Sequence, residues 1–81
     1  MDTEHIAERL TRRFGLGTKP TLRQALYQRL AALVEAEGDR AYLVIATVAA
    51  DSAGKREPGR YFACVVMKRL MERGILEAPE L

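Results

Sequence analysis

Residues 41–50, AYLVIATVAA, decide the fold class of this chain of 81 residues. Their valines, isoleucine and threonine would suit a buried strand, and periodicity alone does not separate a short apolar strand from a buried helix. Three observations favour the helix: Asp39 stands where an N-cap belongs, alanine is frequent, and the chain offers no second strand for pairing. Because the segment is apolar all round, it is predicted to be a central helix with the other helices packed around it.

The segment just before it is predicted to be a helix that begins at Thr21 and ends at Gly38. Thr21 and Gln24 match the capping box Thr-x-x-Gln, in which each side chain accepts a backbone N–H of the other residue. The apolar stripe of this helix consists of Leu22, Leu26, Leu30 and Leu33. Because Asp39 follows Gly38 directly as the next N-cap, the turn between the two helices is predicted to be tight.

Two more helices complete the predicted domain. The first begins at residues 2–3 and ends in a left-handed C-cap at Gly15. The last begins at Pro58, after a polar loop over residues 51–57, and ends before Gly74. Their apolar faces consist of Ile6, Leu10, Phe14, Phe62, Ala63, Val66, Met67 and Leu70.

Together these patterns predict an all-α fold, a compact four-helix domain over residues 1–81 with a buried apolar third helix. Leu43, Ile45 and Val66 are expected in its core. The domain is either complete or a module of a larger protein. A chain this short buries only about 60–65% of its unfolded surface, so association with a second copy would be a common remedy.

Composition excludes several classes of protein. Cys64 and His5 are the only residues of their types, so neither a disulfide framework nor a zinc site of this chain's own Cys and His ligands is predicted. No apolar run approaches the ~20 residues of a membrane helix. The start, with Asp2, Glu4 and Glu8, matches neither a signal nor a transit peptide. We therefore expect a cytoplasmic protein without membrane contact, metal or cofactor.

No nucleophile stands in a catalytic pattern, so we expect no enzymatic activity. Cys64 has no histidine nearby in sequence, and its place beside the apolar arc of the last helix predicts an inert, buried thiol. Ser52 is the only serine, and no G-x-S-x-G pattern surrounds it.

Charge alternates along the chain in blocks whose sum is +2. Residues 9–34 hold six basic residues and no acid, and residues 52–71 hold five basic residues against Glu57. Such segregation is typical of a polyanion-binding surface, and well-solvated arginine-rich helices produce the same pattern.

The best candidate for an anion site is the start of the last helix, where free backbone N–H groups and the helix dipole favour an anion. Tyr61 adds an aromatic face on which a nucleic-acid base could stack. The predicted nucleic-acid or anion-binding residues are Lys55, Arg56, Arg60, Tyr61, Lys68 and Arg69. A secondary basic patch is predicted from Arg12, Arg13, Lys19 and Arg23.

Residues 55–66, KREPGRYFACVV, resemble a pattern in helical domains of plasmid and phage replication initiators and of DnaD-like helicase loaders. In those domains a basic or polar loop leads into a proline, a small residue, an aromatic pair and aliphatic residues. The Ala/Val-rich helix before the loop extends the resemblance to residues 40–73. The resemblance implies contact with DNA or with replication proteins.

The favoured function is therefore nucleic-acid binding, of DNA rather than RNA, by a non-enzymatic accessory domain related to replication. The alternative is a protein-interaction or oligomerisation module that does not bind nucleic acid. Its candidate contacts are the apolar and aromatic side chains expected at the surface, Leu16, Tyr27, Tyr42 and Val65.

Overall fold

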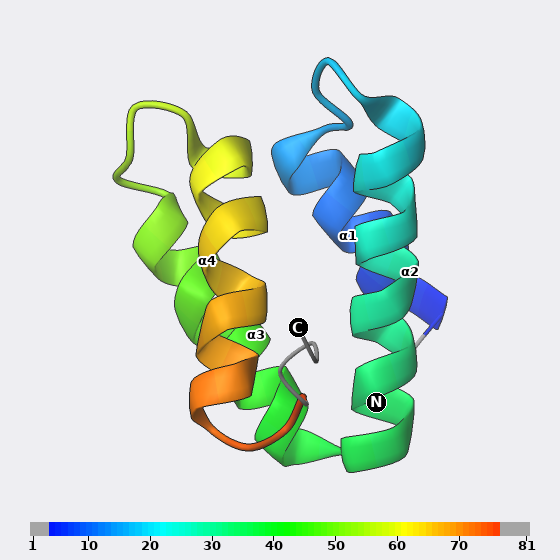
Figure 1. Ribbon diagram of the computed structural model, residues 1–81. Coiled ribbons are helices and arrows are strands. Elements are labelled where there is room, and N and C mark those ends of the chain that lie inside the picture. The colour runs from blue at the N-terminus through cyan, green and yellow to red at the C-terminus, as the bar shows by residue number, and fades with distance from the viewer. Residues whose placement is uncertain (1–3, 77–81) are drawn as a thin grey trace, which may run out of the picture.

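The structure, a computed structural model, describes residues 4–76 and forms four helices over them. The start predicted for the first helix, at residues 2–3, lies outside the described residues. The helices are α1 (Glu4–Phe14), α2 (Pro20–Glu37), α3 (Asp39–Ser52) and α4 (Pro58–Glu72). The predicted all-α, four-helix domain is confirmed. Figure 1 shows two helical hairpins side by side, α1 with α2 and α3 with α4. The hairpin loops, residues 15–19 and 53–57, lie at the same end of the molecule, which we call the loop end (Figure 1).

Helix α3 is not the central helix that its composition predicts. It buries one face, formed by Ala41, Ile45, Val48, Ala49 and Ser52. The side chain of Leu43 is 62% exposed, so its predicted place in the core is wrong, whereas Ile45 and Val66 are confirmed as core residues. Because the hairpins pack side by side, α3 keeps an outer face. That face includes Thr47, whose hydroxyl donates to the Leu43 carbonyl of the same helix at 2.7 Å.

Helix α2 begins earlier than predicted, and its predicted capping box does not form. Pro20 is its first residue, a position that suits the fixed φ of proline and needs no N–H. Thr21 therefore lies inside the first turn, and no side chain caps the helix. The buried face consists of Tyr27, Leu30, Ala31 and Val34. Leu22, predicted on the apolar stripe, is 65% exposed, because the inward face is rotated toward Tyr27.

Three aromatic rings join α1, α2 and α4 near the loop end. The ring of Phe14 stacks on that of Phe62 with 4.7 Å between centroids, and the ring of Tyr27 lies tilted 6.5 Å from Phe62. Tyr27 was expected at the surface and is fully buried. Its burial leaves no polar atom unsatisfied, because its hydroxyl donates a 2.7 Å hydrogen bond to the carbonyl of Gly15. Gly15 adopts the predicted left-handed C-cap, with φ of 70°.

The turn between α2 and α3 consists of Gly38 alone. Its φ of 68° and ψ of −142° lie close to a region that is essentially restricted to glycine. The tight turn is confirmed, although Gly38 occupies the N-cap position and Asp39 is the first residue of α3. Helix α3 runs on to Ser52, whose buried hydroxyl donates to a carbonyl one turn earlier at 2.7 Å. The loop before α4 is therefore shorter than the predicted 51–57.

Candidate anion-binding cleft

A cleft of about 680 Å³ opens at the loop end, between the α1–α2 loop and the start of α4. The residues that give it its shape and charge are Phe14, Lys19, Arg23, Glu57, Gly59 and Arg60. They come from both hairpins, whose loops lie at this same end of the molecule (Figure 1). The fold thus unites Lys19 and Arg23 of the predicted secondary patch with Arg60 of the predicted main site.

Gly59 allows α4 to approach the end of α1. A Cβ atom at this position would lie 3.0 Å from the carbonyl oxygen of Phe14 and 2.9 Å from Nη1 of Arg23. The guanidinium of Arg23 also lies against the α1–α2 loop, where a Cβ atom on Gly17 would be 3.3 Å from Nη2 of Arg23. Arg23 is therefore a half-buried cation held between the two hairpins at the base of the cleft.

The cleft is positively charged. Lys19, Arg23 and Arg60 line it against one acid, Glu57. Helices α2 and α4 both begin at this end, and neither has an acidic residue in its first turn, so the positive ends of both helix dipoles face the same region. Glu57 is the N-cap residue of α4 and makes an exposed ion pair with Arg60 at 3.6 Å. An incoming anion would compete with this carboxylate.

The predicted residues of the α3–α4 loop lie beside the cleft. The ammonium group of Lys55 stands 4.9 Å above the ring of Tyr61, in cation–π contact. Lys55, Tyr61 and Arg60 share a shallower hollow of about 330 Å³ next to the main cleft. Arg56 is exposed in the same loop. These four residues and the cleft form one continuous basic region at the loop end.

The remaining predicted residues are not part of this region. Lys68 lies two turns further along α4, exposed on the same row as Arg60. Arg69 is paired with Glu72 at 3.5 Å. The structure also separates the two arginines at the end of α1. Arg12 lies on the side facing α2 and is paired at 3.4 Å with Glu8, whereas Arg13 faces α3.

Cys64 is exposed rather than buried, which corrects the expectation from its place beside the apolar arc. It lies one turn after Arg60 on the outer row of α4, because the inward positions of that helix are taken by Phe62 and Val66. Among residues 4–76, no group of three or more His, Cys, Asp and Glu side chains could hold a metal ion. None of the four helices is long and apolar enough to cross a membrane.

No family model, curated protein or solved structure matches this chain. The resemblance of residues 40–73 to replication initiators and helicase loaders stays a prediction.

Proposed function

We propose that this domain binds nucleic acid through the basic region at the loop end. The observation that carries the proposal is the meeting of Lys19 and Arg23 with Arg60 in one cleft, although the two segments lie far apart in sequence. Each segment alone is an ordinary basic helix start. Together they form a concave cationic surface, the kind of surface that neutralises phosphate groups.

Phosphate groups are the part of the nucleic acid that the cleft would hold. Guanidinium groups bind phosphate oxygens in a bidentate manner, and the helix starts add partial positive charge. Lys55 and Arg56 extend the surface along the α3–α4 loop. DNA is the favoured ligand, because residues 55–66 resemble the loop-to-helix junction of replication initiators. The binding is non-enzymatic in this proposal, since the region holds cations and no paired general acid and base.

The test is the salt dependence of binding to labelled duplex and single-stranded oligonucleotides, measured by fluorescence anisotropy. Each phosphate contact contributes ~0.9 to the slope of log K against log salt concentration on duplex DNA. The triple variant Lys19→Gln/Arg23→Gln/Arg60→Gln is expected to reduce the slope by up to about 2.7.

The matched control is Arg12→Gln/Arg29→Gln/Arg40→Gln, which removes three cations outside the cleft. Both triple variants change the net charge from +2 to 2 − 3 = −1. An equal loss in both would show that net charge, rather than the cleft, drives binding. Binding of the unmodified domain weaker than about 100 μM at low salt, the range of weak non-specific binding, would overturn the proposal.

Substitution of Glu57 is expected to change the affinity in the opposite direction, because it removes a negative charge from the cleft. Its carboxylate is 3.6 Å from Arg60 and repels a phosphate at the start of α4. Glu57→Gln is therefore expected to tighten binding about two- to fivefold at low salt, in keeping with an exposed ion pair of up to ~1 kcal/mol. A loss of affinity would contradict the assigned site.

A second candidate function, association with a protein, rests on Leu43. This side chain is 62% exposed and, with Val44 and Ile75, lines a shallow hollow of about 270 Å³ flanked by Arg40 and Arg73. The partner would be another protein or a second copy of the chain. Sedimentation of Leu43→Ser beside the unmodified domain tests self-association, because a second copy as the partner predicts a concentration-dependent mass that the substitution abolishes.

A further inference from the structure

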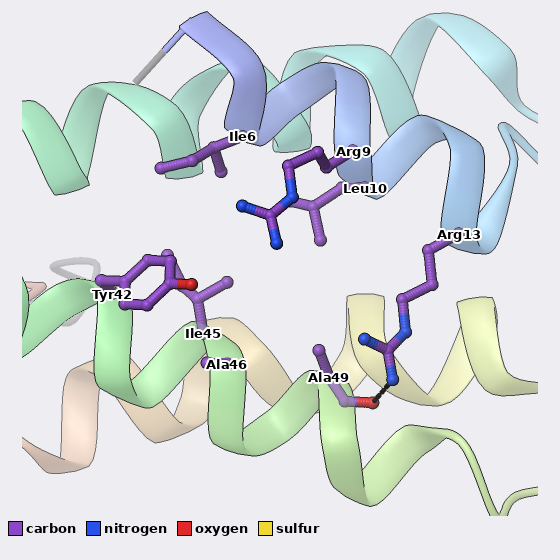
Figure 2. A pocket seen from close by; sticks show the side chains of 8 residues that line it. All are labelled: Ile6, Arg9, Leu10, Arg13, Tyr42, Ile45, Ala46 and Ala49. Atoms are coloured by element: carbon purple, nitrogen blue, oxygen red, sulfur yellow. Dashed lines mark hydrogen bonds between the residues drawn. The ribbon is translucent and has the colours of Figure 1, made fainter. Parts of the chain in front are cut away.

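A second hollow, of about 220 Å³, lies between α1 and α3, and we call it the α1–α3 hollow. Its floor is formed by the buried side chains of Ile6, Leu10 and Ile45. The ring of Tyr42 forms one end (Figure 2). It shares no lining residue with the cleft at the loop end. Any ligand it takes is therefore independent of the nucleic-acid proposal.

Two arginines stand over this apolar floor. Arg9 and Arg13 lie one turn apart on α1, and Figure 2 shows both side chains reaching from α1 toward α3. Arg13 donates a 3.3 Å hydrogen bond to the carbonyl of Ala49, near the negative end of the α3 dipole. The guanidinium of Arg9 ends over the gap between the two helices (Figure 2).

Within residues 4–76 neither of these guanidinium groups is in an ion pair. Among the arginines of the described residues, four have a glutamate within 3.4 to 3.6 Å, namely Arg12, Arg40, Arg60 and Arg69. The other arginines of that range, which include the exposed Arg9 and Arg13, have none. Like charges at positions i and i+4 of a helix destabilise it. A bound anion would reduce the repulsion between Arg9 and Arg13. The hollow therefore offers an anion two things, an apolar floor and a cationic rim without an acidic partner.

We propose that the α1–α3 hollow binds a small carboxylate with a ring-sized apolar body. The hollow is open to solvent on one side, and its volume of about 220 Å³ leaves room for one aromatic ring, for which an enclosed apolar cavity needs ~150 Å³. The body lies on Ile6, Leu10 and Ile45, and the carboxylate accepts hydrogen bonds from Arg9 and from the free N–H groups of Arg13. Planar guanidinium groups suit a carboxylate because they can donate two parallel hydrogen bonds.

The experiment is an NMR titration of the full 81-residue chain with three probes. Benzoate carries both the ring and the charge, benzamide carries the ring without the charge, and acetate carries the charge without the ring. Benzoate is expected to shift the amide signals of residues 42–49 in a saturable manner. Its affinity is expected to exceed that of either other probe by about tenfold, the effect of one charge-assisted hydrogen bond or a comparable apolar contact.

Variants locate the site. Arg9→Gln is expected to weaken benzoate binding about tenfold. The control is Arg12→Gln, because Arg12 is paired with Glu8 on the side of α1 that faces α2. This variant is expected to leave the affinity for benzoate unchanged. Ala46→Leu, at an exposed position of the lining, is expected to fill the hollow and abolish binding while the thermal midpoint is retained. The chemical shifts of the free variants show directly that each is folded.

Three results would overturn the proposal. One is equal binding of benzamide and benzoate, since the arginines would then be irrelevant. Another is an Arg9→Gln variant that binds as tightly as the unmodified domain. The third is the absence of saturable shifts up to about 10 mM benzoate, because a dissociation constant in the low millimolar range would already produce them. None of these results bears on the cleft at the loop end.

Discussion

Gly59 shows how much a single missing Cβ contributes to the candidate cleft. A Cβ there would meet a backbone oxygen of α1 at 3.0 Å and the guanidinium of Arg23 at 2.9 Å. Gly59→Val is expected to lower the free energy of unfolding by about 1–3 kcal/mol, the usual penalty for overpacking. It should also displace Arg23. Urea denaturation measures the first effect, and the Arg23 Nε–Hε NMR signal reports the second.

The control for this variant is Gly54→Val in the α3–α4 loop. A Cβ at Gly54 would meet no atom within 4 Å, and its φ is not positive. A surface change of this kind is expected to alter stability by no more than about 0.5 kcal/mol. Equal effects of the two valines would mean that α4 and α1 are not in close approach at Gly59.

Tyr27 carries a second prediction, about its hydroxyl. The group is fully buried and donates to the Gly15 carbonyl at 2.7 Å. Tyr27→Phe keeps the ring contact with Phe62 and leaves that carbonyl without this partner, so it is expected to cost about 0.5–1.5 kcal/mol. The half-buried Tyr42 offers the control, because Tyr42→Phe removes a hydroxyl from a partly solvated ring. A neutral Tyr27→Phe would contradict the hydrogen bond.

The helix ends marked by glycine or proline were predictable from the sequence, whereas the N-caps expected at Thr21 and Asp39 were wrong. The directions in which the helices face were not predictable. Gly15, Gly38 and Pro58 mark real boundaries because capping and backbone freedom act locally. The inward face of a helix depends on its neighbours instead. The partner that permits Tyr27 to be buried is a loop carbonyl 12 residues away, which no local pattern indicates.

The orientation of helix α3, which its sequence did not predict, can be measured. Its composition is apolar all round, so burial of Leu43 and of Ile45 looked equally favourable in the sequence. In the structure Leu43 is 62% exposed and Ile45 is 4% exposed. Ile45→Ala is expected to cost about 2–5 kcal/mol, whereas Leu43→Ala should stay within about 0.5 kcal/mol. Chemical denaturation of both variants tests the orientation, and the reverse order would mean that α3 is rotated.

The arrangement of the two hairpins decides which charged side chains lie close together. This arrangement was the feature least predictable from the sequence. The basic blocks were visible as composition, but block 9–34 divides among three surfaces. Arg12 faces α2, Arg9 and Arg13 face α3, and Arg23 reaches the start of α4. The signal that could have revealed Arg9 is its four-residue spacing from Arg13, which places both on one side of a helix.

The fourth prediction concerns the whole basic region, where Tyr61 would separate single strands from duplexes. Duplex bases are already stacked, so an aromatic side chain can stack only on unpaired bases. Tyr61→Ala is expected to weaken single-strand binding by about 1–3 kcal/mol and leave duplex binding within about 0.5 kcal/mol. Anisotropy with one sequence in both forms at low salt measures the difference.

The position of Lys55 decides how that experiment is interpreted. Its ammonium group lies 4.9 Å above the Tyr61 ring. A base that stacks on this face of the ring would need to displace the ammonium group or share the face with it. Phosphate binding by Lys55 would draw the ammonium group off the ring and open this face to a base. Tyr61→Phe keeps the ring and should therefore bind both forms as the unmodified domain does. An equal loss on single strands and duplexes in Tyr61→Ala would instead mean that the ring only positions Lys55, because phosphate contacts alone are common to both forms.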